Sequence, residues 1–170
     1  GRIARNLARM LGGFRVNILA YDPFVQSIPE EEGVVLAASA EELFEQCDIV
    51  SLHIPSTEET RGSVDGRLFS RMKKGACLIN TCRGDVVNEK DLAEALCSGR
   101  IGAAGLDVLA EEPPCSDNPL LLMDNVFISS HMGAESFESG RRSQEIMGEN
   151  VELFVKGILS ENVRNKEFLG

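Results

Sequence analysis

Three apolar segments that read as buried strands are each followed at once by a polar side chain. The segments and their polar residues are 76–84 with Arg83, 103–109 with Glu112, and 126–131 with His131. In an open parallel α/β sheet, the carboxyl ends of neighbouring strands line one crevice, so residues that are distant in sequence converge there. The pattern therefore predicts a parallel α/β sheet in which a cation, a carboxylate and an imidazole are neighbours.

These three side chains together can bind a carboxylate substrate and move a proton at the adjacent carbon. The guanidinium of Arg83 offers a planar fork that matches a carboxylate. The imidazole of His131 can act as an acid or a base, and the carboxylate of Glu112 can hold that imidazole in place. Each residue also has a plainer reading, since most arginines are solvated and most histidines are structural.

Composition limits the class of protein and of partner. A chain of 170 residues with 43% hydrophobic content is about one domain with a core of its own. Lys and Arg number 17 against 27 for Asp and Glu, which argues against a nucleic-acid partner. No apolar stretch approaches the roughly 20 residues that span a bilayer, and no signal core is visible, so we expect no membrane partner and a cytoplasmic protein. The five cysteines form no Cys-x-x-Cys pair, so neither a disulfide frame nor a metal site is expected.

The first 23 residues are typical of half a nucleotide-binding unit. Residues 1–11 have helical apolar spacing, and a strand over 16–21 is closed by Asp22. Gly1 and Ala4 fit the last two small positions of a Gly-x-Gly-x-x-Gly/Ala turn, and Asp22 lies where an acidic residue binds the ribose hydroxyls. A turn role for Asp22 before proline is the alternative. The first strand and first glycine are missing, so we expect a piece of a longer protein.

Helices and strands alternate through the rest of the chain. The expected helices cover 39–47, 66–72, 89–98 and 134–157, and the expected strands cover 48–54, 76–80, 103–109 and 126–128. Ser39 followed by Glu42 forms a capping box. The segment before the last strand contains three prolines and is expected to be loop. In the last helix the apolar face consists of Met147, Val151, Phe154 and Val155.

Short motifs along nearly the whole chain resemble the nucleotide-binding domain of the D-isomer-specific 2-hydroxyacid dehydrogenases. They are Gly-Arg-Ile-Ala-Arg (1–5), Tyr-Asp-Pro (21–23), His-Ile-Pro (53–55), Thr-Arg-Gly (60–62), Met-Lys-Lys-Gly (72–75), Asn-Thr-Cys-Arg-Gly (80–84), Gly-Leu-Asp-Val (105–108), Glu-Pro (112–113) and Ser-His-Met-Gly (130–133). The resemblance implies a Rossmann-like doubly wound parallel sheet, here lacking its first strand and the substrate lobe. It also implies an incomplete NAD-binding domain over 1–158 and a return segment toward the substrate domain over 159–170.

The same resemblance assigns roles to individual residues. It implies that Arg83 binds the substrate carboxylate, that His131 exchanges the proton at the 2-hydroxyl, and that Glu112 pairs with His131. The residues implied at the NAD site are Gly1, Arg2, Ile3, Asp22, His53, Ile54, Pro55, Thr60, Thr81, Cys82, Arg83, Asp107, His131 and Gly133. His53 is expected to pack near the cofactor rather than transfer protons, and the Cys82 thiol is as consistent with filling space. Ser130 stands where the family usually has proline. The serine in place of proline is expected to loosen the turn before His131.

The function expected from this resemblance is hydride transfer between NAD(H) and a D-2-hydroxy acid/2-oxo acid pair, in a protein that forms a homodimer when intact. The 170 residues alone are expected to be inactive. The alternative is a non-catalytic, dinucleotide-sensing interaction protein like the corepressors of the same family, and turnover of 2-oxo acids separates the two. A nucleotide-dependent hydrolase is disfavoured, because the sequence shows no nucleophile elbow and no metal cluster.

Overall fold

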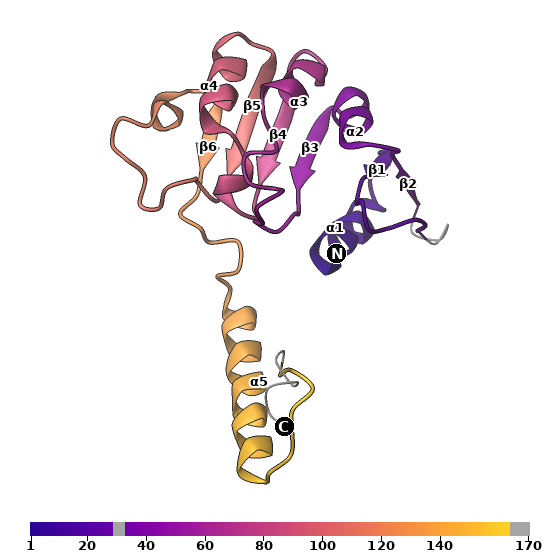
Figure 1. Cartoon of the computed structure of the whole chain (residues 1–170), viewed down its shortest axis with the longest axis vertical. Helices are drawn as coiled ribbons and strands as arrows, with labels where there is room; N and C mark the ends of the chain where they lie inside the picture. The colour runs from indigo at the N-terminus through magenta and orange to yellow at the C-terminus, as the bar shows by residue number, and fades with distance from the viewer. Residues whose placement is uncertain (29–32, 164–170) are drawn as a thin grey trace. The chain divides into compact units, whose positions relative to one another are not determined.

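The computed structural model describes residues 1–28 and 33–163, and the chain divides into two units, Gly1–His131 and Met132–Gly170. The first unit alternates strands with helices (Figure 1). Its elements are α1 (Arg2–Leu11), β1 (Ile18–Ala20), β2 (Val34–Leu36), α2 (Ala40–Gln46), β3 (Ile49–Leu52), α3 (Gly66–Arg71), β4 (Ala76–Asn80), the 3-10 helix η2 (Gly84–Val86), α4 (Glu89–Cys97), β5 (Ile101–Leu106), the 3-10 helix η3 (Pro119–Leu122) and β6 (Val126–Ile128). The second unit contains α5 (Phe137–Val155).

All strand pairs in the first unit are parallel, which confirms the expected α/β class. The strands β3, β4, β5 and β6 form one sheet in chain order, and β1 pairs with β2 in a second sheet. Among the described residues, no strand hydrogen-bonds to both β1 and β3, so the predicted sheet occurs as two pieces.

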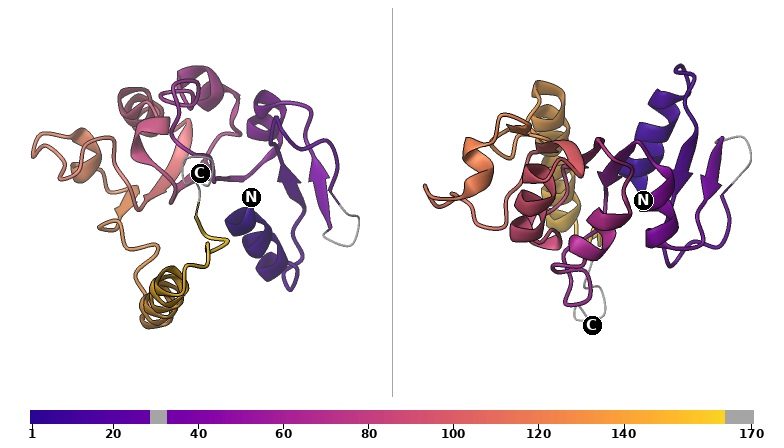
Figure 2. Two further views of the ribbon diagram at one scale, coloured as in Figure 1. Left: turned by 60° about the horizontal axis from the view of Figure 1, so that its bottom comes forward. Right: turned by 90° about the horizontal axis from the view of Figure 1, so that it is seen from above.

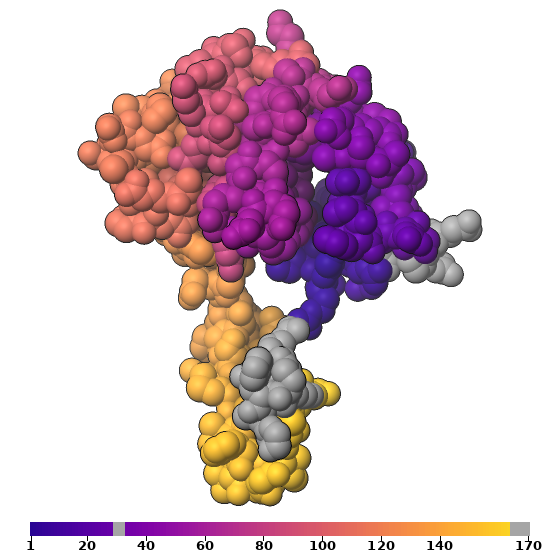
Figure 3. Space-filling model, in the orientation of Figure 1, coloured from indigo at the N-terminus to yellow at the C-terminus, as the bar shows by residue number. Residues whose placement is uncertain are grey.

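The core lies between the four-stranded sheet and the helices α3 and α4. Both helices lie on one face of the sheet (Figure 2), and Figure 3 views this helical layer from outside. Phe69 of α3 and Leu92 of α4 are fully buried, as is Leu78 of β4. Side chains alternate between the faces of a strand, so Ile79 of β4 and Phe127 of β6 lie on the opposite face and are exposed.

Side-chain caps set where the helices begin. Ser39 Oγ accepts a hydrogen bond from the Glu42 N–H at 3.1 Å, and Glu42 Oε2 accepts one from the Ala38 N–H at 2.6 Å. This reciprocal pair confirms the predicted capping box, although the glutamate reaches Ala38 rather than the cap residue. Asn88 caps α4 in the same way by accepting from the Asp91 N–H.

Several predicted boundaries were wrong. The strand expected at 103–109 is β5 at Ile101–Leu106. The segment before β6, predicted to be loop throughout, contains η3, because Asn118 caps it and Leu120 is buried in the core. Sequence patterns also missed the short strand β2. Of the expected return segment 159–170, residues 164–170 lie outside the described residues.

The helix α5 begins after Ser136, whose Oγ accepts a hydrogen bond from the Ser139 N–H. Its predicted apolar face, Met147, Val151, Phe154 and Val155, is exposed. No helix in residues 1–28 and 33–163 is both long enough and apolar enough to cross a membrane.

Candidate active site

The predicted pair of a carboxylate and an imidazole is in direct contact. His131 Nδ1 lies 2.7 Å from Glu112 Oε2, and Glu112 Oε1 accepts a hydrogen bond from the Leu109 N–H at 3.0 Å. The hydrogen bond from His131 lowers the pKa of Glu112, and the bond from Leu109 lowers it further. An ionised carboxylate can only accept, so Nδ1 carries the ring proton of this contact and Nε2 is left to exchange a proton with a substrate.

The backbone of His131 is fixed by the end of the neighbouring strand. Its N–H donates to the carbonyl oxygen of Asp107 at 2.9 Å, and the Ser129 hydroxyl donates to Asp107 Oδ1 at 2.6 Å. His131 has a φ of 55°, in the left-handed region that few residues other than glycine adopt. The buried Asp107 thus holds the turn in which His131 lies, through its main-chain carbonyl oxygen and through its side-chain carboxylate.

The turn that carries Arg83 is organised by the buried side chain of Asn80. Asn80 Nδ2 donates to the Arg83 carbonyl oxygen at 2.9 Å, and Asn80 Oδ1 accepts from the N–H and the thiol of Cys82. The Asn80 carbonyl oxygen accepts from the Asp107 N–H at 2.9 Å. The turns after β4, β5 and β6 are therefore joined by hydrogen bonds from Arg83 through to His131.

Gly84 allows the Arg83 turn to lie directly against the segment that precedes Glu112. A Cβ at Gly84 would lie 2.0 Å from the carbonyl carbon and oxygen of Leu109 and 2.5 Å from the nitrogen of Ala110. No side chain fits in such a space. The structure thus brings the Arg83 turn beside the Glu112 loop, while the exposed guanidinium of Arg83 itself donates to the Cys82 carbonyl oxygen at 2.6 Å.

Glu89, the first residue of α4, holds the loop that carries Glu112. Its Oε1 accepts from the Ala110 N–H at 2.6 Å, and its Oε2 accepts from Asn118 Nδ2 at 2.9 Å. Sequence reasoning missed Asn80, Glu89 and Ser129 as residues of this site. The available signal was position, because Asn80 ends a strand and Glu89 begins a helix next to the same crevice.

The N-terminal candidates for cofactor binding lie at a helix start and a strand end. Gly1 is the N-cap of α1, and no side chain caps the helix. The first-turn N–H groups are therefore not occupied by a cap, and this is the kind of end that binds phosphate groups. Asp22 follows β1, and its Oδ1 accepts from the Phe24 N–H at 3.0 Å. Arg2 and Ile3, in the first turn of α1, are exposed.

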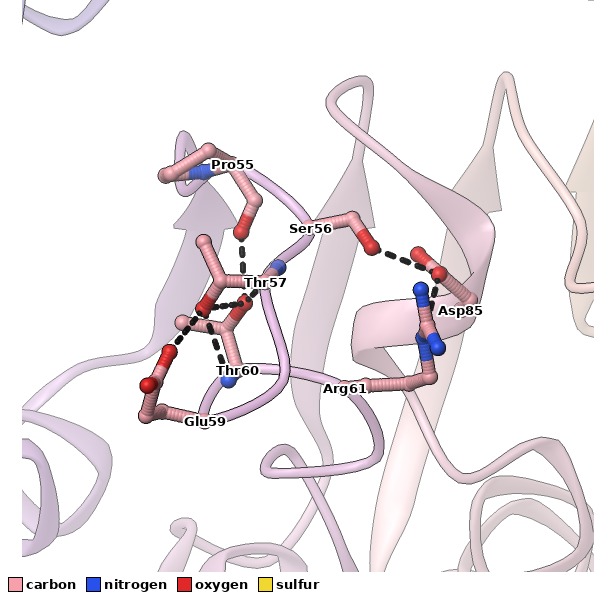
Figure 4. A network of polar contacts seen from close by, with 7 residues as sticks. All are labelled: Pro55, Ser56, Thr57, Glu59, Thr60, Arg61 and Asp85. Atoms are coloured by element: carbon pink, nitrogen blue, oxygen red, sulfur yellow. Dashed lines mark hydrogen bonds and ion pairs between the residues drawn. The ribbon is translucent and has the colours of Figure 1, made fainter.

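The candidates after β3 form a compact loop (Figure 4). Thr60 Oγ1 donates to the Pro55 carbonyl oxygen at 2.6 Å and accepts from the Thr57 N–H at 2.8 Å. His53, half-buried like Ile54, has its Nε2 3.1 Å from Ser51 Oγ. Burial lowers the pKa of His53.

The remaining candidates fall at other positions. Thr81 is exposed and Cys82 is half-buried, both directly after β4. Gly133 belongs to the second unit. Within residues 1–28 and 33–163, no group of three or more His, Cys, Asp or Glu side chains could hold a metal ion.

Comparison with known proteins shows which family shares these features. Residues 1–133 match the model of the D-isomer specific 2-hydroxyacid dehydrogenase NAD-binding domain. The chain is 40% identical over 166 residues to D-3-phosphoglycerate dehydrogenase of Methanocaldococcus jannaschii, covering 97% of this chain and 32% of that protein. It is 41% identical to glyoxylate reductase of Korarchaeum cryptofilum, covering 98% of this chain and 50% of that protein.

Solved structures agree with the sequence relatives. The D-isomer specific 2-hydroxyacid dehydrogenase of Lactobacillus delbrueckii ssp. bulgaricus, in its NAD-complexed form, has a TM-score of 0.88 at 30% identity and covers 97% of this chain and 54% of its own. The D-lactate dehydrogenase of Lactobacillus jensenii with NAD+ has a TM-score of 0.86 at 30% identity and covers 95% and 52%. This chain spans about a third to a half of the length of these proteins. The chain therefore belongs to the D-isomer specific 2-hydroxyacid dehydrogenase family, to its NAD-binding domain.

Proposed function

We propose that this chain is the NAD-binding part of an oxidoreductase that transfers a hydride between NAD(H) and a D-2-hydroxy acid/2-oxo acid pair. The observation that carries the proposal is the contact between His131 and Glu112 beside the turn that holds Arg83. Family membership supports the same reaction class. The chain covers only part of its relatives, so the activity is proposed for the complete protein that carries this chain.

In the direction of reduction, the three side chains act on different atoms of the substrate. Arg83 binds the carboxylate through two parallel hydrogen bonds. His131 gives a proton from Nε2 to the carbonyl oxygen, and Glu112 stabilises the charged imidazolium that does so. The bound dinucleotide supplies the hydride that adds to the carbonyl carbon. Asn80 holds the turn of Arg83, and Asp107 holds the turn of His131. The hydrogen bond between Asn80 and Asp107 joins the two turns, so the carboxylate anchor and the proton donor keep a fixed spacing.

The residues proposed to hold NAD fit a dinucleotide chemically. The uncapped N-terminus of α1, with Gly1, Arg2 and Ile3, offers main-chain donors to the pyrophosphate. Asp22, at the end of β1, accepts hydrogen bonds from ribose hydroxyls. The loop after His53 and the turn after β4 would line the rest of the dinucleotide, through Ile54, Pro55, Thr60, Thr81 and Cys82. Asp107, His131 and Gly133 are proposed at its nicotinamide end.

The test is NADH-dependent reduction of a panel of 2-oxo acids by the complete protein, followed by loss of NADH absorbance. Arg83→Lys should raise the KM for the oxo acid by about 10- to 100-fold, the effect of losing one charge-assisted hydrogen bond. An ammonium cannot reproduce the planar pair of donors. The Kd for NADH should change far less. If no 2-oxo acid is reduced the proposed function is wrong, and if the KM is unchanged Arg83 is not the anchor.

Asp22 should make the complete protein prefer NAD over NADP by at least about tenfold in kcat/KM, because a carboxylate repels the 2'-phosphate. Asp22→Asn should narrow this preference while keeping an oxygen for the Phe24 N–H, so the turn after β1 is preserved. Steady-state kinetics with both cofactors measure the ratio. Equal efficiency in the unmodified protein would rule out this role for Asp22.

The organisation of the complete protein is also a proposal. We place residues 1–158 in the NAD-binding domain and residues 159–170 in a segment that returns to a substrate domain. We further propose a homodimer in the cytoplasm. The 170 residues alone are expected to reduce no 2-oxo acid at a measurable rate, whereas the complete protein should do so.

A further inference from the structure

The loop that follows β3 is attached to the turn that carries Arg83 by a carboxylate to which neither the family motif nor the proposed reaction assigns a role. Asp85 Oδ2 accepts from Ser56 Oγ at 2.6 Å and from Arg61 Nε at 3.1 Å (Figure 4). Ser56 directly follows Pro55, and Asp85 is two residues beyond Arg83. The contact therefore joins the two segments that are proposed to face the cofactor and the substrate carboxylate.

The two segments differ in how firmly they are held. Gly84, Val86 and Val87 are buried, so the turn after Arg83 is part of the core. Residues 57–59 are exposed. The exposed loop is therefore held in place by its contact with the buried turn after Arg83.

The loop is also folded before it is attached. The Thr60 hydroxyl bonds both Pro55 and Thr57, which closes the turn over residues 55–60. A turn closed in this way moves as one piece, so a single contact at Ser56 fixes the orientation of Pro55 as well. The far end of the loop has a separate attachment, because the Gly62 N–H donates to the Asp85 carbonyl oxygen at 2.8 Å and Val64 pairs with Val87.

The side chain of Asp85 therefore holds both ends of the 56–61 segment, through Ser56 and Arg61, whereas the bond to Gly62 is made by the Asp85 main chain. Substituting it leaves the main-chain bond to Gly62 in place and removes the contacts with Ser56 and Arg61. The hydrogen bond from Ser56 lowers the pKa of Asp85, and the Arg61 guanidinium lowers it further. The carboxylate is therefore charged at neutral pH, and both contacts are charge-assisted hydrogen bonds.

We propose that Asp85 is a positioning residue that, through Ser56 and Arg61, holds the 55–61 loop on the Arg83 turn in the orientation that binds the dinucleotide. The inference rests on the proposed function, because it takes that loop as part of the NAD site. Asp85 touches neither substrate nor cofactor in this role. Its loss should weaken cofactor binding without removing a group that reacts.

The experiment measures NADH affinity by fluorescence titration of the complete protein. Asp85→Asn should raise the Kd for NADH about tenfold or more, as expected for loss of charge-assisted hydrogen bonds. The KM for NADH should rise in parallel, while kcat at saturating NADH stays within about threefold. Asp48→Asn is the matched control, since it breaks an exposed carboxylate contact with Lys73 of 2.9 Å just before β3, and it should leave the Kd within about twofold.

Two further variants separate positioning from a general loss of stability. Ser56→Ala should raise the Kd, and Ser56→Thr, which keeps the hydroxyl, should restore it. The double variant of Asp85→Asn with Ser56→Ala should bind NADH no more weakly than the worse single variant. Both substitutions remove the same hydrogen bond between Ser56 and Asp85, so their effects should not add. A Kd for Asp85→Asn within twofold of the unmodified protein, or effects that multiply in the double variant, would overturn the proposal. Failure of the unmodified protein to bind NADH would instead reject the proposed function.

Discussion

His131→Asn in the complete protein should lower kcat for 2-oxo acid reduction by about 100- to 10,000-fold, the usual contribution of a positioned general acid. The asparagine amide cannot deliver a proton to the substrate oxygen. Asparagine is preferred over alanine because His131 has a φ of 55°, a region that asparagine adopts more readily than other residues with a side chain. The loss of rate then reports the imidazole and not a change of backbone.

Steady-state rates with NADH and the best oxo acid measure this effect, and two controls accompany it. The melting temperature should stay within a few degrees of the unmodified protein, because the backbone hydrogen bond from residue 131 to Asp107 is kept. The Kd for NADH should stay within about threefold. A kcat within tenfold of the unmodified protein would show that another group supplies the proton.

Local signals predicted most of the fold because each depends on residues close in sequence. The capping box of Ser39 and Glu42 requires a spacing of three residues, and the structure has it. Apolar runs located β3, β4 and β6, with Pro55 after the first run and Gly75 before the second. The strand β2, three residues long like β6, was not predicted.

The contacts that position the site could not be predicted in this way. Ser56 and Asp85 are 29 residues apart, as are Glu89 and Asn118. Neither pair has a spacing that marks it, and each depends on how far a loop extends beyond its strand. The rule that strand ends converge predicted that Glu112 and His131 would be neighbours. It did not predict that Asn80 and Asp107 would join the turn of Arg83 to the turn of His131 by hydrogen bonds.

Gly84→Ala should reduce both the free energy of unfolding and the kcat/KM for the oxo acid. The new Cβ would lie 2.0 Å from the Leu109 carbonyl group, which is main chain in the buried segment after β5 and cannot rotate away as a side chain could. Overpacking of this kind costs about 1–3 kcal/mol or more of unfolding free energy. The Arg83 turn must then move away from the Glu112 loop, so kcat/KM for the oxo acid should fall by at least about 100-fold.

The matched control is Gly105→Ala in β5, where the new Cβ would meet only Ile79 Cγ1 at 4.0 Å, an ordinary contact. Denaturant unfolding and oxo acid kinetics of the complete protein should separate the two variants clearly. The fall in kcat/KM should also persist at temperatures where the Gly84→Ala protein is still fully folded, since the displaced turn is a feature of its folded state. Equal stability and activity in the two variants would mean that the close approach of the two turns is not required, and Arg83 and His131 would then owe their spacing to the Asn80 and Asp107 hydrogen bonds alone.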